Sequence, residues 1–225
     1  MYIGVDLGTS GVKVLMTNEQ GRIIGSVTRN YPIDQSTPQW SEQNPIDWFD
    51  QTIIALKELI QKTNQQHIKS ISFSGQMHGL VILDEHHELI RNAILWNDQR
   101  TYEACQYLNE TIGQDVVSSH TSNMALTGFT APKLLWLKEF EKPNFERIHK
   151  ILLPKDFLIF KLTGLIATDH SDASGTLLYD VKNRCWSEKM MEIIGLSTDK
   201  LPTIYESNEV VGRISQKIAE TLCIN

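Results

Sequence analysis

The stretch Gly4-Val5-Asp6-Leu7-Gly8-Thr9-Ser10-Gly11-Val12-Lys13 joins two segments with the apolar alternation of β-strands and includes the end of the first and the start of the second. Residues 2–6 predict the first strand, and residues 12–17 predict the second. The polar turn Asn18–Gly21 ends in a glycine that can adopt positive φ, and residues 22–29 return as a third strand. We therefore expect a three-stranded antiparallel meander in which the quoted stretch contains the first connection.

The same stretch gathers groups that suit a phosphate bound to a divalent cation. They are a carboxylate, a glycine-rich turn, two hydroxyls and an ammonium, contributed by Asp6, Gly8, Thr9, Ser10, Gly11 and Lys13. In this interpretation Asp6 binds Mg²⁺, while the turn and Lys13 bind phosphate oxygens. A plain hairpin, whose glycines and hydroxyls only form the turn, is the alternative. The connection joins strand to strand, which separates it from a Walker loop or a Rossmann fingerprint.

Composition narrows the class of protein. The 225 residues carry a formal net charge of −6, which disfavours nucleic-acid binding because that requires a basic face. No apolar run approaches the roughly 20 residues of a membrane-spanning helix, and a signal-peptide pattern is absent from the first residues. The widely spaced Cys105, Cys185 and Cys223 suggest neither a metal site nor a disulfide framework. We expect a soluble cytoplasmic protein without nucleic-acid or membrane partners.

Helices and strands follow along the remainder of the chain. Asn44 is placed to cap a helix with Pro45 in its first turn. A stripe with spacings of three and four predicts the buried face of that helix, formed by Ile46, Phe49, Ile53, Leu56 and Ile60. Strands are expected over residues 68–74 and 80–83. Further helices are expected over residues 101–111, 133–141, 154–162, 188–194 and 214–222. The pattern predicts one α/β domain.

Six further motifs occur in order along the chain. They are Trp40–Pro45 (WSEQNP), Ser74–Leu80 (SGQMHGL), Leu95–Arg100 (LWNDQR), Thr127–Leu134 (TGFTAPKL), Leu153–Asp156 (LPKD) and Thr168–Thr176 (TDHSDASGT). Together with the first turn, they resemble the FGGY family of carbohydrate kinases over nearly the whole chain. The resemblance implies an actin-like ATPase or ribonuclease H-like α/β domain. In that fold a mixed sheet, an antiparallel meander plus parallel strands, is flanked by helices.

Within the family, the segment Gln76-Met77-His78-Gly79 is most similar to the xylulokinase branch. The resemblance implies that Gln76, Met77 and His78 face the sugar. Physically, His78 can exchange a hydrogen bond with a hydroxyl, and Met77 can pack on the carbon chain. Asp98 and Arg100 are candidates for the same cleft or for a structural ion pair, and the sequence leaves both open.

The resemblance also implies an activity, the ATP-dependent phosphorylation of D-xylulose to D-xylulose 5-phosphate with Mg²⁺ as cofactor. Gly8, Thr9, Ser10 and Lys13 would bind phosphate, and Asp6 the metal ion. In the family the general base is an Asp in a Gly-Gly-Asp-Asn-like motif, here expected beyond Asn225. A carboxy-terminal domain supplies the nucleotide contacts. Residues 1–225 are therefore expected to be the amino-terminal, sugar-binding domain, inactive alone and able to form a homodimer through its uncovered face.

Other functions remain open at this point. Gluconate and ribulose are alternative substrates within the family, whereas glycerol kinases resemble this chain less because they carry Arg-Glu in place of Met77-His78. A second hypothesis is a non-catalytic sugar-binding or regulatory module of the same fold. An actin-like or chaperone-like ATPase has no reason to carry Gln76–Gly79. The polar run with Asp169 and Asp172 is interpreted as turn and cap chemistry, and the tryptophans as packing residues.

Overall fold

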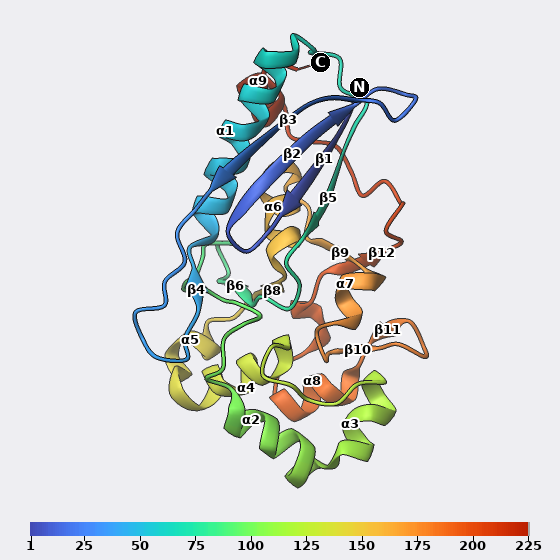
Figure 1. Cartoon of the computed structure of the whole chain (residues 1–225). Helices are drawn as coiled ribbons and strands as arrows, with labels where there is room; N and C mark the ends of the chain where they lie inside the picture. The colour runs from blue at the N-terminus through green and yellow to red at the C-terminus, as the bar shows by residue number, and fades with distance from the viewer. Residues whose placement is uncertain (225) are drawn as a thin grey trace.

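A four-stranded mixed sheet forms the upper part of the computed structural model, which describes residues 1–224 (Figure 1). Strands β1 (Tyr2–Leu7), β2 (Gly11–Thr17) and β3 (Ile23–Asn30) are antiparallel neighbours, so the predicted meander is confirmed. Strand β5 (Ser70–Gly75) pairs with β1 in parallel, which gives the order β3-β2-β1-β5. The sheet thus combines a meander with a parallel strand, as the predicted fold class requires.

Two helices, α1 (Pro45–Thr63) and α6 (Pro154–Thr163), cover one face of this sheet (Figure 1). The covered face contributes the buried side chains Ile3, Val5, Leu7, Val12, Val14 and Met16. On the opposite face, Asp6, Lys13 and Ser74 are exposed. They lie side by side because Asp6 pairs with Lys13 on β2 and with Ser74 on β5. One face of the sheet therefore builds the core, and the other is polar and open.

Helix α1 begins as predicted, and the centre of its buried face lies beside the predicted stripe. The Asn44 side chain accepts a hydrogen bond from the backbone N–H of Ile46 at 3.0 Å, and Pro45 occupies the first turn. The buried residues are Pro45, Trp48, Thr52, Ala55, Leu56, Leu59 and Ile60, whereas Ile46, Phe49 and Ile53 are only partly buried. These three still pack against the core, so the predicted stripe is confirmed for Leu56 and Ile60 and in part for the other three. The helix is rotated so that the large Trp48 is fully buried and its indole N–H donates to Gln43 Oε1 at 3.0 Å.

A second hydrophobic core fills the lower part of the molecule (Figure 1). The short antiparallel strands β6 (Val81–Leu83) and β8 (Lys150–Leu152) contribute side chains to both cores. The helices of this part are α2 (Tyr102–Gln106), a π-helix (Tyr107–Gly113), α3 (Gln114–Thr121), α4 (Thr130–Phe140), α5 (Lys142–Glu146) and α8 (Glu188–Ile194). The remaining elements are β4 (Glu42–Gln43), β7 (Ala93–Ile94), β9 (Ala167–Asp169), α7 (His170–Ser174), β10 (Tyr179–Asp180), β11 (Cys185–Trp186), a 3₁₀ turn (Thr198–Lys200), β12 (Thr203–Tyr205) and α9 (Gln216–Leu222).

The five further predicted helices all exist, with differences at their ends. Helix α8 matches residues 188–194, and α4 starts three residues before the predicted residue 133. The helix expected over residues 101–111 changes to π-helical geometry at Tyr107 and runs on into α3, which the sequence analysis did not predict. Helix α3 buries Val117 and Thr121, two residues four apart, which is too short a stripe to stand out from the sequence.

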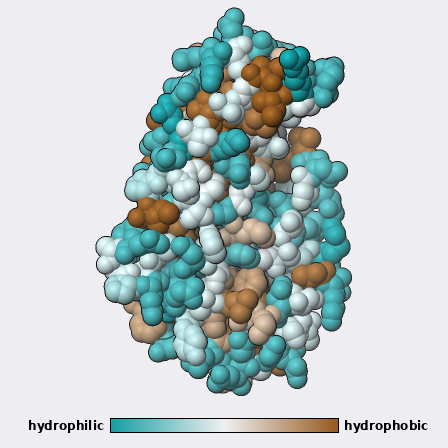
Figure 2. All heavy atoms as spheres, in the orientation of Figure 1, coloured by the Kyte–Doolittle hydropathy of each residue, from teal (hydrophilic) through white to brown (hydrophobic). Residues whose placement is uncertain are grey.

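The surface is mixed in character. Figure 2 shows hydrophobic residues in several separate groups among hydrophilic ones, with the largest group of this view near the upper end of the sheet. Among the described residues, no helix has the length and apolar character needed to span a membrane.

Candidate functional site

The two motifs singled out from the sequence begin at the same edge of the sheet. Because β1 and β5 are parallel neighbours, Leu7 lies opposite Gly75, and both strands end there. The backbone N–H of Gln76 donates to the carbonyl of Leu7 at 2.7 Å, which joins the two connections directly. The first turn and the segment Gln76–Gly79 therefore leave the sheet side by side, where the carboxyl ends of parallel strands commonly present binding groups.

The first turn is held by its own backbone and by two neighbouring side chains. The Gly8 N–H donates to the Gly11 carbonyl at 3.0 Å, so this donor is used within the turn. The hydroxyl of Tyr31 donates to the Gly8 carbonyl, and Gln43 Nε2 donates to the Thr9 carbonyl at 2.8 Å. These bonds leave the hydroxyl of Ser10 and the side chain of Lys13 exposed. The turn is thus fixed before any ligand binds.

Asp6 lies at the end of β1 on the open face of the sheet. Its Oδ1 accepts a hydrogen bond from Ser74 Oγ at 3.1 Å. The side chain is exposed, and its register partner on β2 is Lys13. A carboxylate with accessible oxygens beside a hydroxyl is the type of ligand that Mg²⁺ prefers, together with water and phosphate oxygens. The residues present therefore fit the predicted magnesium site.

Gly11 is required by a close strand approach and not by a special backbone conformation. A Cβ at this position would lie 2.5 Å from the Arg29 carbonyl oxygen and 2.8 Å from Asn30 Oδ1. We predict that Gly11→Ala lowers the free energy of unfolding by about 1–3 kcal/mol, because the obstructing atom is backbone of β3. Gly4→Ala is the matched control on β1, since a Cβ there meets nothing within 4 Å. Urea denaturation of both variants measures the difference, and equal stabilities would contradict the prediction.

His78 occupies an unusual backbone conformation in a closely packed place. Its φ is 64°, in the left-handed region that non-glycine residues rarely adopt. The imidazole Nδ1 lies 2.5 Å from the Gly175 carbonyl oxygen, and the ring meets Phe129 edge-on with centroids 4.9 Å apart. A Cβ on Gly175 would lie 2.7 Å from His78 Cε1 and 3.0 Å from Met77 Cε. Gly175 thus packs directly against both predicted sugar-facing side chains.

The contact with Gly175 determines which nitrogen of His78 carries the hydrogen. Burial is the largest influence on this group and lowers the pKa of His78 below its usual value, so the imidazole is neutral at neutral pH. Because a carbonyl oxygen only accepts hydrogen bonds, Nδ1 must be the donor. The other nitrogen, Nε2, then has a lone pair and can accept a hydrogen bond from a hydroxyl group.

Gln76 is buried and connects the two turns. Its Nε2 donates to Gln43 Oε1 at 3.1 Å, and Gln43 in turn donates to the Thr9 carbonyl. Gln76 Oε1 is buried and has no hydrogen-bond partner among the described residues. The sequence analysis predicted that Gln76 contacts the sugar. That contact stays a prediction, and in the structure Gln76 Nε2 links the His78 segment through Gln43 to the first turn.

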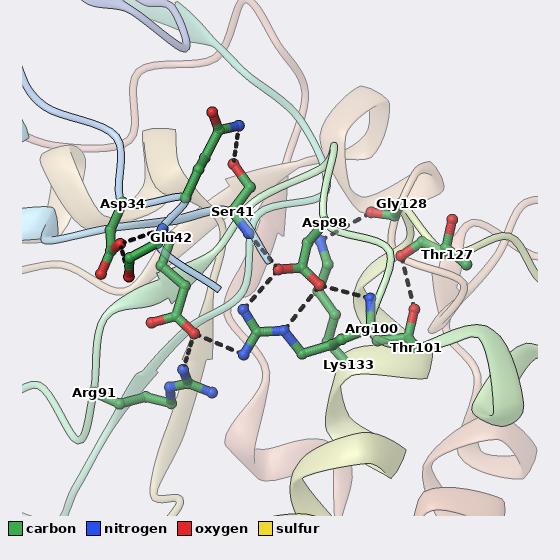
Figure 3. A network of polar contacts seen from close by, with 12 residues as sticks. Asp34, Ser41, Glu42, Arg91, Asp98, Arg100, Thr101, Thr127, Gly128 and Lys133 are labelled. Carbon is green, nitrogen blue, oxygen red and sulfur yellow. Dashed lines mark hydrogen bonds and ion pairs between the residues drawn. The ribbon is translucent and has the colours of Figure 1, made fainter. Parts of the chain in front are cut away.

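Asp98 and Arg100 form a buried ion-pair network (Figure 3). Arg100 donates to Asp98 at 2.9 Å from Nε and at 2.6 Å from Nη2, and its Nη1 lies 2.6 Å from Glu42 Oε1. The guanidinium carbon lies 3.6 Å from the ring centroid of Trp40. Asp98 also accepts from the Ser41 N–H at 2.7 Å. The side chains of Asp98 and Arg100 are 0% and 1% exposed, which favours the structural ion pair over direct contact with a sugar.

The motif Trp40–Pro45 connects the lower core with the first turn. Trp40, Ser41 and Glu42 bind the network around Arg100, as described above. Gln43 binds the first turn, and Asn44 caps α1. With Pro45 in the first turn of α1, every residue of this short motif therefore has a structural role.

Trp96 is a candidate that the sequence analysis treated only as a packing residue. Its side chain is 46% exposed, and its indole N–H donates to Thr9 Oγ1 at 2.9 Å. A Cβ on Gly128 would lie 2.8 Å from the Trp96 carbonyl oxygen, so the loop before α4 packs against this residue. Trp96 closely follows the short strand β7 in the sequence. An aromatic residue at such a place is as common in a core as in a binding site, so the sequence alone did not distinguish the two.

Asp169 and Asp172 lie in a different environment. Asp169 caps α7 by accepting from the Asp172 N–H at 3.1 Å, so the predicted cap chemistry is confirmed. Lys155, which the sequence did not single out, is buried and donates to Asp169 Oδ2 at 2.7 Å. Its Nζ also lies 3.4 Å from both Asp156 and Asp172. This lysine has its charge balanced by carboxylates.

Comparison with known proteins identifies the family. Residues 1–225 match the amino-terminal domain of the FGGY family of carbohydrate kinases. The chain belongs to this family. Among the relatives of this FGGY chain, the xylulose kinase of Bacillus subtilis (strain 168) is 45% identical over 219 residues, which are 96% of this chain and 44% of that protein. The chain thus spans less than half the length of that curated relative.

Solved structures of family members agree with the fold of the FGGY chain. A xyloylose kinase from Brucella ovis superimposes with a TM-score of 0.95 at 36% identity, covering 100% of this chain and 46% of that one. A gluconate kinase from Lactobacillus acidophilus superimposes equally well, with a TM-score of 0.95 at 29% identity, covering 100% of this chain and 45% of that one. The mixed α/β architecture is therefore that of the actin-like sugar kinases.

Proposed function

We propose that this chain is the amino-terminal, sugar-binding domain of an ATP-dependent kinase that converts D-xylulose to D-xylulose 5-phosphate. The observation that carries the proposal is the meeting of two turns at one sheet edge, where Leu7 lies opposite Gly75. One turn offers an exposed carboxylate, a hydroxyl and an ammonium suited to a metal-bound phosphate. The other presents Met77 and a neutral histidine suited to a sugar. Phosphoryl transfer requires those two ligands to be neighbours.

Each side chain has a role in this proposal. Thr9, Ser10 and Lys13, with the backbone at Gly8, bind phosphate oxygens, and Asp6 holds Mg²⁺. The metal ion supplies charge neutralisation on the phosphates when bound. His78 Nε2 accepts from a sugar hydroxyl, and Met77 packs on the carbon chain. Since Asp98 and Arg100 are buried, they would stabilise the protein around the sugar site without touching the sugar.

The remaining parts of the proposal concern the whole protein. We infer that the general base, an Asp, and the main contacts to the nucleotide belong to a carboxy-terminal domain beyond Asn225. The relatives that extend about twice the length of this chain support this. Residues 1–225 alone are then expected to hydrolyse no ATP above background. Three free cysteines fit a reducing, cytoplasmic compartment, and sedimentation would test whether the open face forms a homodimer.

The test is a kinase assay of the product of the complete reading frame, with Mg²⁺, ATP and a panel of D-xylulose, D-ribulose, gluconate and glycerol. The proposal expects the highest kcat/KM for D-xylulose and loss of turnover in Asp6→Asn. Higher kcat/KM for gluconate, which the similarity to the Lactobacillus structure makes a fair competitor, would overturn the substrate. Sugar binding in calorimetry without any phosphorylation would favour a binding module instead.

A specific prediction concerns His78. We expect His78→Asn to raise the KM for the sugar about tenfold, since loss of one hydrogen bond costs about 0.5–1.5 kcal/mol, and to leave the KM for ATP unchanged. Asparagine is chosen because it tolerates the positive φ of this position. In the unchanged protein the sugar KM should rise at acidic pH, because protonation converts the Nε2 acceptor into a donor. Initial-rate kinetics against pH measure both effects. If the sugar KM of the variant depended on pH as it does in the unchanged protein, the role of His78 as the hydrogen-bond acceptor would be contradicted.

A further inference from the structure

Lys133 is fully buried and has no ion-pair partner within residues 1–224. Its side chain is 0% exposed, and burial lowers the pKa of Lys133 to about 7. Among the described residues no carboxylate lies within 4 Å of its Nζ; the nearby Asp98 is already occupied by Arg100 and Ser41 (Figure 3). Lys155, the other buried lysine of the site region, is surrounded by carboxylates instead. Burying an ammonium in this way carries a desolvation cost that a methionine of similar size would avoid.

The ammonium of Lys133 instead binds two backbone carbonyls. Nζ donates to the His78 carbonyl at 2.7 Å and to the Gly128 carbonyl at 2.9 Å. Figure 3 shows the second bond, with Lys133 reaching from α4 past Asp98 towards Gly128. The hydroxyl of Thr130 donates to the same His78 carbonyl at 3.2 Å. Two buried donors therefore converge on one peptide group of the segment Gln76–Gly79.

The backbone at His78 has an unfavourable conformation that its surroundings must stabilise. A non-glycine residue at φ 64° costs on the order of 1–3 kcal/mol and persists only when its surroundings hold it. Gly128, the second residue whose carbonyl Lys133 binds, belongs to the loop that packs on Trp96. The same loop leads into Phe129, whose ring contacts His78. Lys133 thus ties together the three segments that carry His78, Phe129 and Trp96.

We propose that Lys133 is a positioning residue for the sugar-facing turn, joining the carbonyls of His78 and Gly128 so that the side chains of Met77 and His78 are held in place for the substrate. The inference rests on the proposed function for the identity of the substrate. That Lys133 positions the turn is inferred from the contacts of Lys133 alone.

The first experiment reads the position of His78 and needs no substrate. Histidine resonances of the 225-residue chain are recorded by NMR, with His78→Asn assigning the His78 signal. Lys133→Met should move the His78 Cε1–H resonance, because the ring changes its place relative to Phe129 and Gly175, while the other six histidines keep theirs. Lys138→Met is the matched control: it lies on the same helix and also donates to a carbonyl, that of Ile194 at 2.7 Å, but away from this turn.

The second experiment measures kinetics of the complete protein. Lys133→Met should raise the sugar KM about tenfold with the KM for ATP unchanged, and Lys138→Met should change neither. A folded Lys133→Met with an unmoved His78 resonance would overturn the inference. Should that variant fail to fold, Lys133→Gln keeps a polar side chain that is too short to bind both the His78 and the Gly128 carbonyls, and an unmoved His78 resonance there would equally overturn it. Absence of sugar kinase activity in the unchanged protein would overturn the proposed function. The NMR result would still decide whether Lys133 positions the His78 turn.

Discussion

Gly175→Ala is expected to raise the sugar KM of the complete protein on the order of 10- to 100-fold, because small misplacements of binding groups have effects of that size. The added Cβ would lie 2.7 Å from His78 Cε1, 2.9 Å from Nδ1 and 3.0 Å from Met77 Cε. All three atoms belong to ends of side chains, so the side chains give way and the backbone of Gly175 does not. At φ −86° alanine itself is unstrained.

The same variant distinguishes an effect on the position of Met77 and His78 from an effect on the stability of the fold. Since only side-chain ends are displaced, we expect the free energy of unfolding to fall by no more than about 1 kcal/mol. The hydrogen bond from His78 Nδ1 to the Gly175 carbonyl should be lost, while ATP binding is unaffected. Gly4→Ala, on an uncrowded position of β1, is the control and should leave both quantities unchanged. Wild-type kinetics in Gly175→Ala would show that Met77 and His78 do not contact the sugar.

Arg100→Ala is expected to lower the free energy of unfolding by about 3–5 kcal/mol, the usual cost of removing one partner from a buried ion pair. The change leaves the carboxylate of Asp98, with no exposed surface, without its strongest partner. It also removes the guanidinium that lies between Glu42 and the ring of Trp40. Denaturation in guanidinium chloride or urea measures the loss.

The matched control for this prediction is an exposed pair. Lys189 and Glu192 are 3.0 Å apart on α8 with both side chains largely exposed, so Lys189→Ala should change stability by less than about 1 kcal/mol. A similarly small effect of Arg100→Ala, together with a raised sugar KM, would favour the alternative in which Arg100 contacts the substrate. The experiment therefore decides between the two interpretations that the sequence left open for Asp98 and Arg100.

Local patterns were the reliable part of the sequence-based prediction. The meander, the Asn44 cap and helix α8 depend on residues close together in the chain, and each occurs where it was expected. The buried face of α1 is centred beside the predicted stripe because Trp48 is buried in the core and donates a hydrogen bond to Gln43. The change to a π-helix at Tyr107 has no comparable local signal.

By itself, the sequence determined the family, the order of the motifs and the chemical types at the site, because those properties belong to residues one after another in the chain. Only the tertiary structure decided what Asp98, Arg100 and Gln76 contact, since burial and partners depend on segments far apart in sequence. It alone showed what Lys133 and Gly175 contact, since they lie 55 and 97 residues beyond His78. Both residues belong to motifs of the sequence, but the role of each at the His78 turn follows only from the folding that brings them against it.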